Sequence, residues 1–209
     1  GSPNVIKAVI MLEELEIPYA FERVNVLAGE QFSDAFKRLN PNSKVPVLVD
    51  ERLSEAPVTV FESGAILMYL AESTGRFWPQ DIRERYQVIE WLMFQMAGFG
   101  PISGQAIHFT RSHKEPGYAQ TRFINELTRL TNVVESRLAD NAYIAGSDYS
   151  IADMALFPWV RTLVDFFPDL VKGAHTQDWY AAIHARPAVE RAIQLANDLA
   201  TEHMTIFRA

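Results

Sequence analysis

Residues 43–50 combine a backbone feature and a strand pattern that could hold a peptide ligand. The apolar run after Pro46 predicts a β-strand, and proline, which has no N–H to donate, is confined to the start or the edge of a strand. An X-Pro bond is also the one peptide bond in which the cis form costs little. If the Val45–Pro46 bond is cis, the N–H and C=O of Val45 turn outward and can pair with an extended ligand.

A second stretch, residues 58–64, follows after a short loop and ends a strand pattern on Glu62 and Ser63. A helix pattern starts at Ser63, and the first N–H groups of a helix are unpaired and carry partial positive charge. With the Ser63 hydroxyl they form a potential carboxylate site beside Val45, so the two stretches predict a clamp for a peptide. The simpler alternatives are strand packing for Val45, a surface carboxylate for Glu62 and a helix cap for Ser63.

The composition restricts the classes of function. The chain has 209 residues, enough for one domain or two small ones, and its 48% hydrophobic residues can fill substantial cores. No apolar run approaches the roughly 18 residues of a membrane span, and no signal segment is recognisable. We therefore expect a soluble, cytoplasmic protein with no membrane partner. A net charge of −7 without a broad basic face argues against nucleic acid as a partner.

The chain contains no cysteine, which excludes disulfides, thiolate metal sites and a protein thiol nucleophile. Its histidines show no pair at the i, i+4 spacing of a helical zinc site, so no metal is expected. Any thiol chemistry must therefore come from a ligand. The histidines are His108, His113, His175, His184 and His203.

Ser150, Asp153 and the nearby His175 could suggest a hydrolase triad. The sequence contains no G-x-S-x-G elbow, however, and a capping box accounts for the spacing of the serine and the aspartate. We therefore expect a structural role for Ser150 and Asp153.

The pattern of apolar residues changes near residue 80 and predicts two domains. Residues 1–75 show mixed helix and strand patterns, residues 76–80 form a linker, and residues 81–209 show helical periods without a strand pattern. Ser2 is placed to cap the first helix, with Pro3 at its first position. The expected elements of the first domain are helix 3–16, strand 19–26, helix 32–39, strands around Val47 and Thr59, and helix 63–73. The expected helices of the second domain are 81–99, interrupted at 98–101, then 118–138, 150–164, 177–185 and 187–200.

The motif N-P-x-x-K-V-P-x-L-V-D at 40–50, followed by F-E-S-G-A-I-x-x-Y-L at 61–70, resembles the glutathione transferase superfamily. The resemblance implies a thioredoxin-like α/β first domain that binds glutathione, an all-α helical-bundle second domain and a homodimer. In that family a strand precedes the first helix. We expect the first domain to lack this strand, which would have been the parallel partner of strand 19–26.

Further segments, among them G-E-Q-F at 29–32 and G-P-x-x-G-Q-x-x-H-F at 100–109, are similar to the bacterial nu class. The S-P-N turn resembles the T-P-N-G-x-K segment of that class, with Ser2 in place of threonine and Val5 in place of glycine. That class binds up to two glutathiones per site and usually reduces disulfides more strongly than it conjugates electrophiles. The resemblance implies Ser2 and Asn4 beside the sulfur, Gln31, Lys44 and Val45 at the glycyl and cysteinyl parts, Glu62 and Ser63 at the γ-glutamyl group, Arg122 at the site mouth, and Pro46, Ser150 and Asp153 as structural residues.

The chemistry implied for Ser2 and Asn4 is stabilisation of a thiolate. A free thiol has a pKa of about 8.5, and hydrogen-bond donors at a helix start lower it. The expected function is a glutathione-dependent transferase or disulfide reductase acting on a small electrophile or disulfide. One alternative is a non-catalytic glutathione-binding module for regulation or assembly. For Arg122 the alternative is a surface arginine paired with Glu126 at i+4.

Overall fold

The computed structural model describes residues 2–52, 56–112, 117–198 and 204–208. The chain divides into two compact units: unit 1 comprises Gly1–Arg76 and Ala185–Ala209, and unit 2 comprises Phe77–His184. This division assigns the last helix and strand to unit 1, whereas the sequence pattern placed residues 185–209 with the helical domain. Each unit is described separately below.

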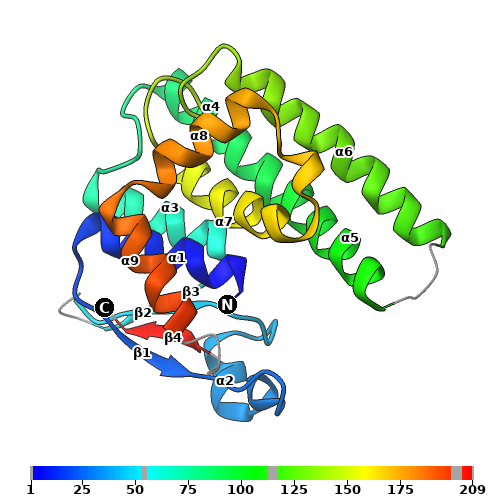
Figure 1. The fold of residues 1–209 in the computed structure, drawn as a ribbon. Helices are drawn as coiled ribbons and strands as arrows, with labels where there is room; N and C mark the ends of the chain where they lie inside the picture. Colours follow the sequence, from blue (N-terminus) through cyan, green and yellow to red (C-terminus); the bar gives the residue numbers. More distant parts are fainter. Residues whose placement is uncertain (1, 53–55, 113–116, 199–203, 209) are drawn as a thin grey trace. The chain divides into compact units, whose positions relative to one another are not determined.

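Unit 1 is built on a four-stranded sheet in the order β1-β4-β2-β3 (Figure 1). The strands are β1 (Ala20–Arg23), β2 (Val47–Asp50), β3 (Val58–Phe61) and β4 (Met204–Arg208). β2 pairs antiparallel with β3, while β4 runs parallel to β2 and antiparallel to β1. The expectation of a purely helical segment after residue 80 was therefore wrong. The partner of β1 is a C-terminal strand in the antiparallel direction, not a parallel strand from the start of the chain.

Helices α1 (Pro3–Leu15), α3 (Ser63–Thr74) and α9 (Pro187–Asp198) lie together on one face of this sheet, and α1 packs against the other two (Figure 1). The helix α2 (Asp34–Leu39) lies after a short 3-10 helix (Glu30–Phe32), and its Phe36 packs with Val47 and Val49 of β2. Side chains alternate along a strand, so Asp50 of β2 belongs to the opposite side from Val49. There it accepts a hydrogen bond from Tyr69 of α3 at 2.9 Å.

The helix α1 is buried along most of its length, from Val5 through Leu12. Pro3 occupies its first turn as expected, but the Ser2 side chain makes no capping hydrogen bond. The carbonyl of Ser2 accepts the N–H of Val5 and of Ile6, at 3.0 and 3.1 Å. The backbone alone therefore starts this helix, and the expected side-chain cap was wrong.

Unit 2 consists of helices, and its core helix is α7. This helix begins at the predicted capping box, where both hydrogen bonds between Ser150 and Asp153 are present. The expected interruption at 98–101 is instead a continuous π-helix that leads into α5. An added Cβ at Gly100 would lie 2.5 Å from Gln95 Nε2 and 3.2 Å from Trp159 Nε1, so a larger residue there would force the Gln95 side chain to move. The elements are α4 (Ile82–Phe94), the π-helix (Gln95–Phe99), α5 (Gly100–Ser112), α6 (Tyr118–Leu138), α7 (Ile151–Phe166), a 3-10 helix (Pro168–Leu170) and α8 (Ala174–His184).

The last expected helix, 187–200, is observed as α9 to Asp198, and its residues 199 and 200 lie outside the described part of the chain.

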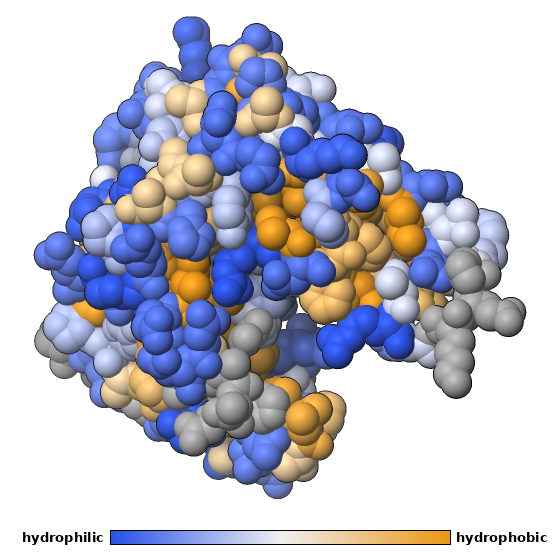
Figure 2. All heavy atoms as spheres, in the orientation of Figure 1, coloured by the Kyte–Doolittle hydropathy of each residue, from blue (hydrophilic) through white to orange (hydrophobic). Residues whose placement is uncertain are grey.

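Within the described part, no helix combines the length and the apolar character needed to cross a membrane. In unit 2, the apolar colouring over α5 and α7 in Figure 2 agrees with the partial exposure of Val164 and Phe166 on α7.

Candidate functional site

The loop before β2 has the predicted backbone: the Val45–Pro46 bond is cis, and β2 begins at Val47. The side chain of Val45 packs against the core cluster that contains Phe36, Val47 and Val49, so the alternative prediction of a packing role for Val45 is also confirmed. Asn40, which is only 1% exposed, donates from Nδ2 to the carbonyl of Lys44 at 2.7 Å. The backbone that leads into the cis bond is therefore held by a buried side chain.

The same loop is tied to the start of α3 through a second asparagine. Asn40 Oδ1 accepts the N–H of Asn42 at 2.9 Å, and Asn42 Nδ2 donates to Glu62 Oε1 at 3.3 Å. The sequence analysis did not identify Asn40 and Asn42 as site residues. Their signal was the pair of asparagines around a proline, because asparagine side chains close turns by bonding their own backbone.

Glu62 adopts a backbone conformation that non-glycine residues rarely adopt, with φ 69° and ψ 119°. It is exposed and occupies the N-cap position of α3, yet its side chain makes no capping hydrogen bond. Strained backbone of this kind is concentrated at binding and catalytic sites. The Glu62 carboxylate therefore does not cap the helix that it begins, and it accepts a hydrogen bond from Asn42.

Ser63 is the first residue inside α3 and is 4% exposed. Because Glu62 holds the N-cap position, the alternative prediction that Ser63 is the cap of this helix was wrong. Its Oγ accepts a hydrogen bond from Lys7 Nζ of α1 at 3.4 Å. At the start of α3, the hydroxyl of Ser63 is therefore in contact with the buried ammonium group of Lys7.

Lys7 is a site residue that the sequence analysis missed. It is fully buried, and burial lowers its pKa to about 7, while the nearby Glu62 carboxylate acts in the opposite direction. Lysine is almost never fully buried unless it is paired. The available signal was the T-P-N-G-x-K segment, because its final lysine falls on Lys7.

Ser2 and Asn4 lie at the start of α1. The side chain of Ser2 is exposed and makes no capping hydrogen bond, so the helix does not use its hydroxyl as a cap. Asn4 precedes Lys7 by three positions, and residues at this spacing share one side of a helix. Asn4 therefore belongs to the side of α1 from which Lys7 reaches Ser63.

Gln31 lies in the 3-10 helix after β1 and donates from Nε2 to the carbonyl of Val26 at 3.2 Å. Its Oε1 is buried and has no hydrogen-bond partner among the described residues. Buried polar atoms without a partner are uncommon in native proteins. This oxygen is an acceptor that a ligand N–H could satisfy, while Lys44 is exposed in the loop that follows α2.

Arg122 is exposed on α6 of unit 2 and lines a surface hollow of about 680 Å³ with Tyr118 and Phe123. The expected alternative was an ion pair with Glu126. That carboxylate is hydrogen-bonded to both Nε and Nη2 of Arg129, at 2.9 and 2.7 Å. Arg129 and, more weakly, the charge of Arg122 lower the pKa of Glu126.

Ser150 and Asp153 have the structural role that was expected. Asp153 is fully buried, and its carboxylate accepts the N–H of Ile144 at 2.8 Å, the N–H of Ser150 at 3.0 Å and Trp179 Nε1 at 2.8 Å. Burial raises the pKa of Asp153, and these donors oppose the rise. The carboxylate is therefore committed to the fold and is not available as part of a triad.

No group of three or more metal-ligating side chains gathers anywhere in the described ranges. His113 and His203 lie outside those ranges.

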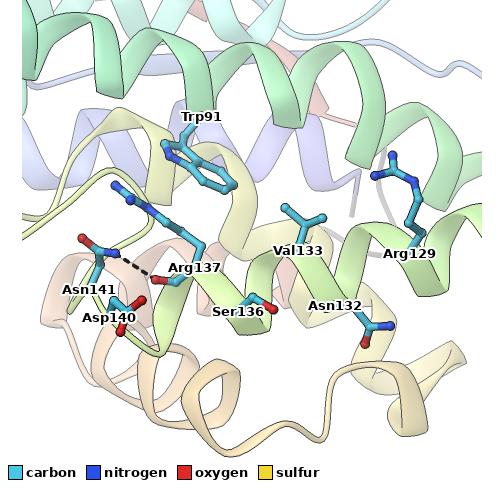
Figure 3. A pocket seen from close by; sticks show the side chains of 8 residues that line it. All are labelled: Trp91, Arg129, Asn132, Val133, Ser136, Arg137, Asp140 and Asn141. Carbon is cyan, nitrogen blue, oxygen red and sulfur yellow. Dashed lines mark hydrogen bonds between the residues drawn. The ribbon is translucent and has the colours of Figure 1, made fainter.

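A second hollow in unit 2, about 580 Å³ in volume, lies between α4 and α6 (Figure 3). The Cζ atom of Arg137 lies over the ring of Trp91, 5.4 Å from the ring centroid. The guanidinium of Arg137 also donates to the carbonyls of Ile144 and Ala145. Asn141 Nδ2 donates to the carbonyl of Arg137 at 2.9 Å. None of the predicted site residues lines this hollow. Its lining residues are Trp91, Arg129, Asn132, Val133, Ser136, Arg137, Asp140 and Asn141.

Comparison with known families places this geometry in context. Residues 1–72 match the model of the glutathione S-transferase N-terminal domain, and residues 101–187 match that of the C-terminal domain. The chain is 39% identical over 197 residues to the disulfide-bond oxidoreductase YfcG of Escherichia coli, covering 92% of this chain and 91% of that protein.

Two solved structures are also similar. A glutathione transferase from Burkholderia graminis, with two glutathione molecules bound per subunit, has a TM-score of 0.84 and 42% identity, covering 92% of this chain and 84% of that one. A glutathione transferase from Pseudomonas putida, with one glutathione disulfide bound per subunit, has a TM-score of 0.86 and 38% identity, covering 93% and 88%. With both domain models matched in order along the sequence, the chain belongs to the glutathione transferase family.

Proposed function

We propose that this protein is a glutathione-dependent disulfide-bond oxidoreductase that can also transfer glutathione to an electrophilic carbon. The observation that carries the proposal is the chain of contacts from the cis-proline loop through Asn42 and Glu62 to Ser63 and Lys7. Relatives of similar length are named for disulfide reduction or have glutathione bound. The protein has no cysteine, so the reacting thiolate must belong to glutathione.

The proposed binding roles follow from the charges of glutathione. Its γ-glutamyl end carries an ammonium group, which the exposed Glu62 carboxylate can accept, and a carboxylate, to which the Ser63 hydroxyl and the N–H groups at the start of α3 can donate. The backbone of Val45 pairs with the cysteinyl part. Gln31 and Lys44 contact the glycyl and cysteinyl parts, where the unpaired Oε1 of Gln31 supports a contact with a ligand N–H. From the family resemblance alone, we propose Arg122 as a further glutathione-binding residue.

The proposed catalytic residues are Ser2 and Asn4, which donate to the glutathione sulfur at the start of α1. Hydrogen bonds and the helix dipole both favour the thiolate there. The thiolate attacks one sulfur of a disulfide substrate, forms a mixed disulfide and expels the other sulfur as a thiolate, which takes up a proton. A second glutathione thiolate then attacks the glutathione sulfur of the mixed disulfide, giving glutathione disulfide and the second reduced thiol. The two electrons come from the two glutathiones, and no metal takes part.

We also propose a homodimer, in the cytoplasm where the glutathione pool is kept reduced. The exposed apolar side chains Ile82, Tyr86 and Met93 follow one side of α4, and Trp91 of the same helix lines the hollow in Figure 3. A second copy covering this surface would remove these side chains from water. Sedimentation at micromolar concentration tests the assembly, and a monomer there would contradict it.

A turnover assay with glutathione against hydroxyethyl disulfide and against a haloarene tests the proposed activity. We expect turnover of both, with the disulfide reduced faster. Tight binding of glutathione without turnover of either substrate would contradict the proposed enzyme and would identify a glutathione-binding module instead.

A further inference from the structure

Lys7 differs from the other buried charged side chains among the described residues, which are Glu14, Asp50 and Asp153. Glu14 pairs with Arg186, Asp50 pairs with Arg52 and Tyr69, and Asp153 closes the start of α7. These three contacts join parts of the fold to each other. The contact of Lys7, in contrast, leads to Ser63, a residue of the proposed ligand site.

We propose that Lys7 is a positioning residue that orients the Ser63 hydroxyl and supplies positive charge behind it, so that the site selects the zwitterionic γ-glutamyl end of glutathione. This inference rests on the proposed function. An ammonium group can only donate hydrogen bonds. In its contact with Lys7, Ser63 Oγ therefore accepts, so the hydroxyl proton points away from Lys7.

The charges at the start of α3 match such a ligand. Lys7 places a positive charge behind Ser63, and the neighbouring Glu62 places a negative charge at the surface. A ligand carboxylate at Ser63 and a ligand ammonium at Glu62 would each face an opposite charge. Lys7 and Ser63 are buried, where electrostatic interactions are stronger than in water, so the ligand carboxylate should contribute most to selection. The exposed Glu62 should add a weaker attraction for the ligand ammonium.

The surroundings of Lys7 define how its charge state responds to the ligand. Glu62, at the N-cap of α3, acts on Lys7, and Tyr69 further along α3 is paired with Asp50 of β2, which also pairs with Arg52. Arg186, just before α9, and Arg191 of α9 pair with Glu14 and Glu13 at the other end of α1. Since the pKa of Lys7 is about 7 before ligand binds, a bound carboxylate should raise it. Binding near pH 7.5 should therefore take up protons.

Calorimetric titration with S-methylglutathione measures this proton uptake, because the blocked thiol has no proton to release. The titration is run at pH 7.5 in two buffers of different ionisation enthalpy. We expect the wild-type protein to take up a clear fraction of one proton per ligand. Lys7→Met should take up none and should bind about 10- to 100-fold more weakly. Lys37→Met removes an exposed lysine of the same unit and should behave as wild type.

Three results would overturn the inference. Wild-type affinity and proton uptake in Lys7→Met would exclude a role in binding, and weaker binding with unchanged proton uptake would indicate a merely structural role. A wild-type protein that binds neither glutathione nor S-methylglutathione would overturn the proposed function itself, and this inference with it. Thermal melting without ligand checks the fold of the variant.

A test that needs no variant uses an S-methylglutathione in which the γ-glutamyl carboxylate is replaced by a carboxamide. With the wild-type protein we expect the proton uptake to disappear, together with most of the affinity. Unchanged proton uptake with this neutral analogue would show that Lys7 does not act on the ligand carboxylate.

Discussion

The starts of α3 and α7 use the same two residue types, a serine and an acidic residue, for opposite purposes. At α7 the carboxylate of Asp153 turns inward and accepts from three N–H groups, and the serine closes a capping box. At α3 Glu62 has a strained backbone and its carboxylate accepts from Asn42, while Ser63 contacts a buried ammonium group. The α7 start uses its polar groups for stability, whereas we propose that the α3 start directs them toward a ligand.

The largest expected effect is on the α7 side. Asp153→Ala leaves buried N–H groups without an acceptor, and each such loss costs about 1 to 3 kcal/mol. We expect the free energy of unfolding to fall by about 3 to 5 kcal/mol, measured by urea denaturation. The exposed Asp148→Ala in the preceding loop should change it little. If the folded Asp153→Ala protein bound glutathione much more weakly, the assignment of a purely structural role to the start of α7 would be wrong.

The second-largest expected effect is the pH dependence of the free energy of unfolding that Lys7 causes. Its pKa of about 7 in the folded protein lies below the ordinary lysine value of 10.5. Between these values the unfolded chain binds more protons, so the free energy of unfolding rises with pH. The contribution of Lys7 to this rise should be about 2 kcal/mol between pH 7.5 and pH 9.

Urea denaturation of the wild type and of Lys7→Met at both pH values isolates this contribution, because all other titrating groups are shared. The variant should lack the rise. Parallel curves for the two proteins would show that the buried lysine titrates normally.

The substitution Ser63→Ala tests whether the start of α3 binds glutathione. Loss of a hydroxyl bonded to a charged carboxylate should weaken glutathione binding by about 1.5 to 3 kcal/mol. Because Ser63 is not the cap of its helix, no capping loss is expected. The free energy of unfolding should fall by about 0.5 to 1.5 kcal/mol, because the buried Lys7 loses one acceptor. Calorimetric titration and thermal melting measure the two quantities. A stability loss of about 1 kcal/mol with unchanged affinity would indicate a local structural role only.

The smallest expected effect belongs to Asn4→Ala. One hydrogen bond to the thiolate contributes about 0.5 to 1.5 kcal/mol, and up to about 3 for a charged acceptor. Disulfide reduction should slow at pH 6 to 7, and the loss should shrink toward pH 9, where the thiol ionises without assistance. An unchanged pH profile with lower stability would assign Asn4 to the turn alone.

Local patterns predicted much of the fold. Most helices of both units, the cis Val45–Pro46 bond and the Ser150–Asp153 capping box depend on neighbouring residues and are observed as predicted. The helix α5 was not predicted, because the glycines and the proline at 98–101 indicated an interruption. The strand β4 was missed because its pairing with β1 and β2 joins distant parts of the chain. No periodicity near Met204 shows which strands it will meet.

The candidate site shows the same limit. Glu62 and Ser63 could be identified from a motif, but the contact from Lys7 joins residues 56 positions apart and depends on how α1 packs on α3. Burial of a lysine contradicts its usual preference, so composition and pattern assign it to the surface. The contact of Asn42 could likewise not be predicted from local patterns, because its partner Glu62 is 20 positions away.

The most direct test of the proposed thiolate mechanism is an ultraviolet titration of the glutathione thiolate in the complex with the wild-type protein. The account predicts a midpoint clearly below the thiol pKa of about 8.5, with Ser2→Ala and Asn4→Ala each shifting it upward. A midpoint equal to that of free glutathione, unchanged in both variants, would contradict thiolate stabilisation at the start of α1.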